Sequence, residues 1–119
     1  MAARILLFSD DTLFQEAGTA FATKKTFRVI SDSLAPVASW RLVISLRNVG
    51  AVGQVSFQCQ IGTDTSPLVV TSAGLETIYS TTFSKTTLDN TPLTVNLQIK
   101  ADVVGPIAEI RYTDLYAIT

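Results

Sequence analysis

Residues 39–62 contain two stretches, on either side of a short bend, in which apolar side chains alternate with mostly polar ones, and this alternation leaves the chain few ways to fold. The first apolar row is Trp40, Leu42, Ile44 and Leu46, and the second is Val55, Phe57, Cys59 and Ile61. Successive side chains of an extended strand point to opposite faces, so each row lies on one side of a strand, whereas a helix would mix the two sets. The pattern predicts two strands, each buried on one face.

A bend of small residues connects these two strands. Residues 48–53 read NVGAVG, which is too long for a two-residue turn. Its glycines can adopt the positive φ values that a longer hairpin connection needs. We therefore expect an antiparallel hairpin whose two apolar rows face the same core.

Further apolar or alternating runs are separated by glycine, proline and Asp/Asn clusters, which indicates more strands. They cover residues 4–9, 12–16, 20–30, 68–71, 75–84, 92–100 and 107–118. Turn signals recur about every 8–12 residues, and no segment has a convincing helical period. The sequence predicts an all-β fold, an antiparallel, jelly-roll-like β-sandwich of about seven to nine strands.

The alternation also predicts which side chains face inward. We expect a core of Trp40, Leu42, Ile44, Leu46, Val55, Phe57, Ile61, Leu93, Val95, Leu97 and Ile99. Cys59 belongs to an inward row, so we interpret it as a small buried hydrophobe, and a single cysteine cannot form an intrachain disulfide. In the last strand, strict alternation places Tyr112 and Tyr116 on the same side as Ile110 and Ile118.

Length and charge restrict the partners. A chain of 119 residues is expected to form one domain, and its nine basic and ten acidic residues offer no broad basic field for nucleic acid. No run approaches the 18 or so apolar residues of a membrane span. We expect a soluble chain made in the cytoplasm, with neither nucleic acid nor membrane as a partner.

The residue types that most often act in nucleophilic catalysis and zinc binding are absent or nearly absent. Histidine is absent, which removes Ser-His-Asp and Cys-His machinery and the commonest zinc ligand, and one cysteine cannot make a thiolate metal cage. Asp10 and Asp11 lack the ligand spacing of a calcium loop, and Asp64 is better explained by hydrogen bonding within a turn. We expect no catalytic residue, no metal and no cofactor, and we do not expect an enzyme.

Exposed aromatic and apolar side chains are the remaining candidates for a binding surface. Tyr112 and Tyr116 lie about 13 Å apart along one strand, and with Tyr79 they are the tyrosines that could stack on a sugar ring. Packing in the core or an interface is the interpretation we prefer. Apolar residues also fall in or near loops, and a contiguous patch of them would mark a partner surface. They are Val49, Val52, Val69 and Val70.

The amino-terminal run Ile5, Leu6, Leu7 and Phe8 is apolar at every position, where a strand with one solvated face should alternate. Both of its faces must therefore be covered. Residues 1–20 have two interpretations. They form an N-terminal arm or a strand that is lent to a neighbouring molecule, or they form a first strand that is buried on both faces in the sandwich. Residues 21–119 form the sandwich domain. The candidate partner contacts are Ile5, Leu6, Leu7, Phe8, Tyr112 and Tyr116.

Four segments together resemble jelly-roll structural proteins of tailed bacteriophages. They are the W-x-L-x-I-x-L strand at 40–46, the G-A-x-G bend at 50–53, the alternating strand at 54–61 and the final apolar pair within 93–118. The resemblance implies a virion protein, made in the host cytoplasm, and often a homotrimer. A short chain without a fibre-like repeat favours a head-decoration (cement) protein that binds the major capsid protein. The alternatives are a receptor-binding tail fibre or spike domain, or a carbohydrate-binding module that binds a glycan.

Overall fold

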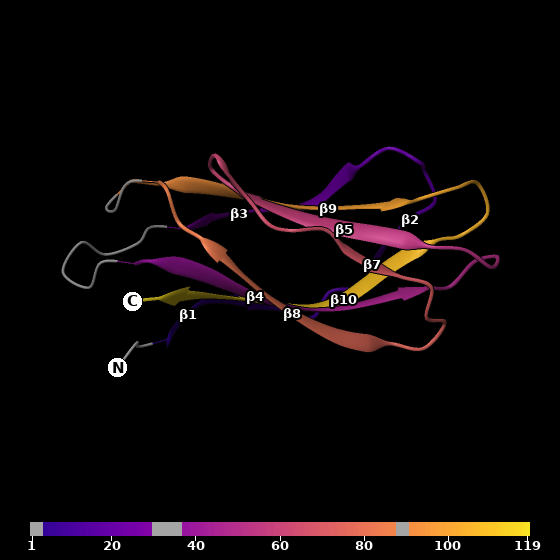
Figure 1. The fold of residues 1–119 in the computed structure, drawn as a ribbon, viewed down its shortest axis with the longest axis horizontal. Coiled ribbons are helices and arrows are strands. Elements are labelled where there is room, and N and C mark those ends of the chain that lie inside the picture. The colour runs from indigo at the N-terminus through magenta and orange to yellow at the C-terminus, as the bar shows by residue number, and fades with distance from the viewer. Residues whose placement is uncertain (1–3, 30–36, 88–90) are drawn as a thin grey trace.

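A computed structural model describes residues 4–29, 37–87 and 91–119, and in these ranges it contains ten strands and no helix (Figure 1). The strands are β1 (Arg4–Asp10), β2 (Phe14–Glu16), β3 (Ala22–Val29), β4 (Ser39–Asn48), β5 (Val55–Ile61), β6 (Asp64–Thr65), β7 (Val69–Thr71), β8 (Thr77–Ser84), β9 (Leu93–Ala101) and β10 (Ala108–Ile118). Most of the loop expected before β4 and part of the turn expected before β9 lie outside the described residues.

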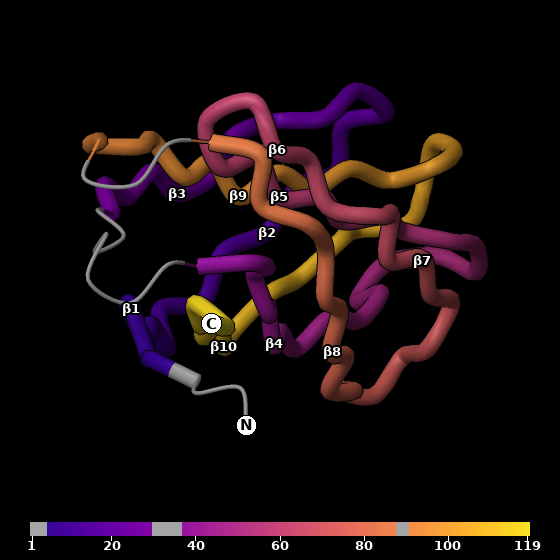
Figure 2. Tube along the Cα trace, turned by 60° about the vertical axis from the view of Figure 1, so that its left-hand side comes forward, coloured from indigo at the N-terminus to yellow at the C-terminus, as the bar shows by residue number. Residues whose placement is uncertain are grey.

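The strands form two antiparallel sheets that pack face to face (Figure 2). Sheet A has the order β1-β10-β4-β8, with β2 also beside β10, and sheet B has the order β3-β9-β5-β6, with β7 also beside β5. Because β3, β4 and β5, and again β8, β9 and β10, alternate between the sheets, the topology is that of a jelly roll. The predicted fold class is confirmed. The strand number exceeds the predicted range because the turn after β5 includes the two-residue strand β6.

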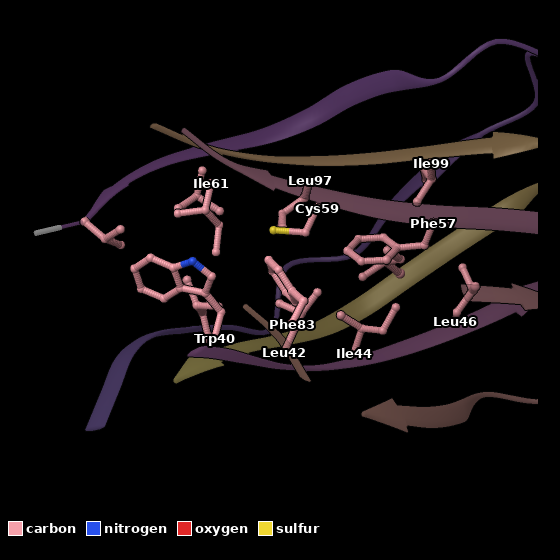
Figure 3. Packing of buried hydrophobic residues seen from close by; sticks show 14 of the residues in the cluster. Trp40, Leu42, Ile44, Leu46, Phe57, Cys59, Ile61, Phe83, Leu97 and Ile99 are labelled. Carbon is pink, nitrogen blue, oxygen red and sulfur yellow. The ribbon is translucent and has the colours of Figure 1, made fainter. Parts of the chain in front are cut away.

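The core lies between the sheets and contains every residue of the predicted set (Figure 3). Trp40, Leu42, Ile44 and Leu46 of β4 face Phe57, Cys59 and Ile61 of β5, as the alternation predicts. Cys59 is buried among these side chains, and this burial raises the pKa of its thiol to about 12. Its interpretation as a buried hydrophobe is confirmed, since a thiol with so high a pKa is not ionised at neutral pH.

The predicted facing of the last strand is wrong beyond Ile110. The register of β10 against β4 shifts between Ile110 and Thr113, which is a β-bulge, and an extra residue reverses the alternation that follows it. Thr113 and Leu115 therefore face the core. Tyr112 is 47% exposed and, like Tyr116, lies on the outer side of sheet A.

A buried serine stabilises this bulge. The hydroxyl oxygen of Ser45 on β4 accepts hydrogen bonds from the backbone N–H groups of Arg111, at 3.0 Å, and Tyr112, at 2.9 Å. These two donors belong to the bulged residues and would otherwise lack ladder partners. Ser45 thus determines, through the bulge, which way the tyrosines of β10 point.

The amino-terminal run forms an edge strand of its own sheet. β1 pairs with β10 of the same chain, so the alternative of a central strand buried on both faces is wrong. Ile5 and Leu6 are 43% and 51% exposed, and the ring of Phe8 stacks on Phe27 of β3 with 4.2 Å between the ring centroids. An arm or lent strand in residues 1–20 stays a prediction about an assembly of several copies, and residues 1–3 lie outside the described ranges.

Asp64 of β6 is a buried hydrogen-bond acceptor at the opposite end of β4 from the bend. Its carboxylate accepts from the indole N–H of Trp40 at 3.0 Å, from the backbone N–H of Thr86 at 3.0 Å, and from the hydroxyls of Thr86 and Thr87. Burial alone raises the pKa of Asp64, but the hydrogen bonds from Thr86 and Trp40 outweigh it and hold the pKa below its ordinary value of 3.8. Asp64 is a hydrogen-bond acceptor, as predicted, but these partners lie on β4 and in the loop after β8 rather than in the turn at residues 62–67.

We expect Asp64→Asn to lower the free energy of unfolding at pH 7 by about 2–3 kcal/mol, because an amide oxygen replaces a charged acceptor of several hydrogen bonds. A carboxyl whose pKa is lowered by folding stabilises the fold above pH 3.8, and this contribution is lost as the pH falls through the folded value. The gap between variant and wild type should therefore shrink in acid. Urea unfolding at pH 7 and pH 3 measures it, with the exposed Asp11→Asn as control. An equal gap at both pH values would contradict this role.

Candidate binding surfaces

The surface of the sandwich holds the candidate sites. Within residues 4–29, 37–87 and 91–119 there is no pocket and no cluster of three or more potential metal ligands among His, Cys, Asp and Glu. The same part of the chain has no helix of the length and hydropathy that would cross a membrane. Two surfaces stand out by the exposed apolar side chains that gather on them.

The first surface is at the end of the sandwich away from the C-terminus, where two loops lie side by side (Figure 1). Residues 49–54 connect β4 to β5, and residues 102–107 connect β9 to β10. Four valines of these loops are exposed, Val52 completely, Val104 by 91%, Val103 by 54% and Val49 by 37%. We call these four residues the valine tip.

The two loops are held together by their backbones. The N–H of Ala51 donates to the carbonyl of Gly105 at 3.1 Å, and the N–H of Val49 donates to the carbonyl of Ile107 at 3.0 Å. A β-carbon on Gly50 would clash with the Gly105 carbonyl and lie 2.8 Å from the Ile107 nitrogen, so only glycine permits this approach. The loops therefore form one unit and not two independent turns.

Asn48, the last residue of β4, holds the two loops together. Its side chain is buried, and its amide NH₂ donates to the carbonyls of Ala51, at 2.7 Å, and Gly53, at 3.1 Å. Its amide oxygen accepts from the backbone N–H groups of Gly50, at 2.9 Å, and Ile107, at 3.0 Å. One side chain thus satisfies four backbone groups in both loops, which fixes the valine tip to the end of β4.

This arrangement suits the valine tip to bind an apolar surface. Burying one valine side chain is worth roughly 1.5–3 kcal/mol relative to leaving it in water. Because the loops are already ordered by Asn48 and by each other, little of this energy is lost in ordering them on binding. A rigid apolar tip therefore offers more affinity than the same residues in a mobile loop.

We expect Asn48→Ala to lower the free energy of unfolding by about 2–4 kcal/mol, because it removes four part-buried hydrogen bonds to backbone groups of both loops. The matched control is Gln58→Ala, which removes one half-buried side-chain hydrogen bond, 2.7 Å to Gln98, and should cost about 1 kcal/mol or less. Urea unfolding measures both variants. Equal losses would show that Asn48 does not organise the loops.

The second surface is the outer face of sheet A near β1, which we call the tyrosine face: Leu6, Arg41, Tyr112, Asp114 and Tyr116. Leu6 and Arg41 are the cross-strand partners of Tyr116 on either side. The Asp114 carboxylate accepts a hydrogen bond from the hydroxyl of Ser9 at 2.5 Å. The face therefore combines aromatic rings with charged and hydroxyl groups.

The predicted partner contacts are divided between this face and the core. Leu6 and Tyr116 are brought together by the β1–β10 pairing, and Ile5 is exposed at the same end of β1. Tyr112 lies further along β10, on the same outer side. Leu7 and Phe8 instead pack against the core, because the register of β1 also shifts between Leu6 and Phe8.

The valine tip was only half visible in the sequence. Val49 and Val52 are apolar residues in or near a predicted bend, whereas Val103 and Val104 fall between the strands predicted at 92–100 and 107–118, where no feature marks them as a surface. The signal that could have found them is the similarity of the two bends, in which valines lie next to glycine in both NVGAVG and VVGP. Their closeness depends on pairing between loops more than 50 residues apart in the sequence, as in the 3.1 Å bond from Ala51 to Gly105.

Comparisons with known proteins found structural likenesses at low sequence identity. No family model matches the chain, and no curated protein matches it either. The C-terminal CBM6 of LamC, a marine laminarinase from Zobellia galactanivorans, is similar over 97% of this chain and 98% of its own, with 11% identity and a TM-score of 0.47. A chain in the structure of infectious bursal disease virus, Gx strain, is similar over 99% of this chain and 35% of its own, with 14% identity and a TM-score of 0.37. This chain thus spans about a third of the viral chain, and neither likeness assigns it a function.

Proposed function

We propose that this protein is a non-enzymatic structural protein of a virus particle. In this proposal it is a decoration, or cement, protein that is made in the host cytoplasm and binds the outside of the capsid. Its partner is the major capsid protein, whose lattice it stabilises by joining neighbouring subunits.

The observation that carries the proposal is the valine tip. It presents exposed apolar side chains, up to the completely exposed Val52, on loops that Asn48 and Gly50 hold in one conformation. Such a surface fits an apolar recess on another protein. The jelly-roll topology agrees with the structural phage proteins that the strand pattern resembles.

Locating the protein on purified particles tests the proposal directly. Immunogold electron microscopy with antibodies against this chain should label the head over its whole surface. Labelling confined to the tail would favour the fibre or spike alternative. Absence of the protein from particles would overturn any virion role.

We expect the double variant V52D/V104D to bind capsids that lack the protein at least about 100-fold more weakly, because two carboxylates would have to be desolvated in the contact. Both positions are so exposed that the fold should be unaffected. The matched control is L68D/V70D, which adds the same charge to exposed apolar residues outside the tip. Co-sedimentation with particles measures binding. A loss as large in the control would show that charge, and not the tip, decides binding.

A carbohydrate-binding module is the second candidate, and the tyrosine face is the observation that favours it. The half-exposed ring of Tyr112 lies on the same outer side as Asp114, so a flat aromatic surface and a hydrogen-bond acceptor are close together. Sugar rings bind to such combinations by stacking on the ring and donating hydroxyl hydrogen bonds.

If this alternative holds, a glycan array should give a signal that Tyr112→Ala abolishes, because the stacking surface is removed. The control is Tyr79→Phe, which removes only a hydroxyl that bonds to Thr71 at 2.6 Å on the inner side of β8. An array without signal for the wild type contradicts the sugar-binding candidate and leaves the capsid proposal standing.

A further inference from the structure

The two sheets have four edges, and three of them are protected against pairing with another chain. β1 has a register shift between Leu6 and Phe8, and β3 has one between Thr23 and Lys25 and carries the charges of Lys24, Lys25 and Arg28. The remaining edge of sheet B consists of the short strands β6 and β7. Bulges, charges and short edge strands are the devices by which soluble proteins prevent edge-to-edge association.

The fourth edge, β8, has none of these devices. Its eight residues, TIYSTTFS, contain no charge, no proline and no glycine, and they pair with β4 from Thr77 to Ser84 without a register shift. Its outer row includes Ile78, which is 58% exposed. Figure 1 shows β8 beside β4 as the last strand of its sheet.

The backbone of β8 is positioned to accept a further strand. The N–H of Asn48, at the end of β4, donates to the carbonyl of Ala73 just before β8 at 2.8 Å, whereas the N–H of Val49 donates to Ile107 on the β10 side. At the other end of β4 the carbonyl of Ala38 accepts from the N–H of Lys85 at 3.1 Å, although its own N–H donates to Ile118 of β10. Even-numbered residues of β4 therefore bond toward β8. Bonded pairs alternate along an antiparallel ladder, so residues 77, 79, 81 and 83 bond to β4. The N–H and C=O groups of residues 78, 80, 82 and 84 then point toward the open edge.

We propose that β8 pairs antiparallel with β8 of a second copy of this chain, around a two-fold axis at Thr81. In this register Ser80 of one copy lies opposite Thr82 of the other, and Ile78 lies opposite Ser84. All four outward-pointing residues of each strand take part, which gives about eight backbone hydrogen bonds. The two A sheets then form one continuous sheet.

The antiparallel register keeps like charges apart. Glu76, exposed just before β8, lies opposite Thr86 of the other copy, and Lys85 lies opposite Thr77. The ammonium of Lys85 donates to the carbonyl of Thr87 in its own chain and lies 6.0 Å from the centroid of the Trp40 ring. A parallel, in-register arrangement would instead place Glu76 opposite Glu76 and Lys85 opposite Lys85, which is unfavourable.

The same geometry limits the assembly to two copies. Pairing uses the β8 edge of both copies, and the outer edges of the combined sheet are then the two β1 strands with their register shifts. An isologous contact of this kind closes with two members. We therefore propose a two-fold pair in place of the homotrimer implied by the resemblance, and this inference does not depend on the proposed capsid function.

Two charge variants of the full chain test the contact. Sedimentation of the wild type at micromolar concentrations should give about twice the chain mass of 12.8 kDa. S80K/T82K and S80E/T82E each place like charges directly opposite across the axis, so each should weaken the pair at least about ten-fold and sediment as a monomer. An equimolar mixture of the two should restore the double mass, because lysine then lies opposite glutamate. A17K/T19K, in an exposed loop before β3, is the control for added charge.

A wild-type monomer, a three-fold mass or growing fibres would overturn the proposal, as would charge variants that remain dimeric. If the variants fail to fold, amide hydrogen exchange of the wild type tests the β8–β8 contact instead. The amides of residues 78, 80, 82 and 84 should be protected at high protein concentration and lose this protection on dilution, while those of 77, 79, 81 and 83 should not change. Protection that does not depend on concentration would also overturn the pair.

Discussion

Face-to-face burial of two apolar rows, one on β4 and one on β5, is the contact on which the other features of this molecule depend. A strand can bury only one side against a facing sheet, so the rows that alternate in the sequence must meet each other. Trp40, Leu42 and Ile44 meet Phe57 and its neighbours in this way. The contact sets the distance and orientation of the sheets, and it thereby decides where each loop leaves the sandwich.

The inward row of β4 ends in a polar anchor at both ends. At one end the indole of Trp40 donates to Asp64, which also holds the loop after β8. At the other end Asn48 holds both loops of the valine tip. A strand of this length spans about 30 Å, so two side chains of one row order loops at opposite ends of the domain. Rigid loops at the ends are therefore a consequence of how the core strand begins and ends.

The three surfaces of interest lie on different parts of the sandwich. The valine tip is at one end, the tyrosine face lies over β1, β10 and Arg41 of β4, and β8 is the opposite edge of the same sheet, where Ser80 accepts a hydrogen bond from Arg41 at 3.0 Å. Because the β8 contact that we propose is antiparallel, its two copies direct their valine tips to opposite ends of the pair.

The amino-acid sequence determined the strands, the sandwich and the core residues of β4, β5 and β9, because period-two alternation acts within each strand and needs no knowledge of its neighbours. Prediction from the sequence failed where contacts with other strands and loops determine the structure. The bulge in β10 exists because Ser45 of another strand satisfies its amides, and it turned Tyr112 and Tyr116 outward against the local pattern. The valine tip likewise depends on hydrogen bonds between distant loops, and the exposure of β8 depends on its place at the end of the sheet order. Alternation determines the two faces of a strand, but only pairing between strands decides register, edge position and which loops meet.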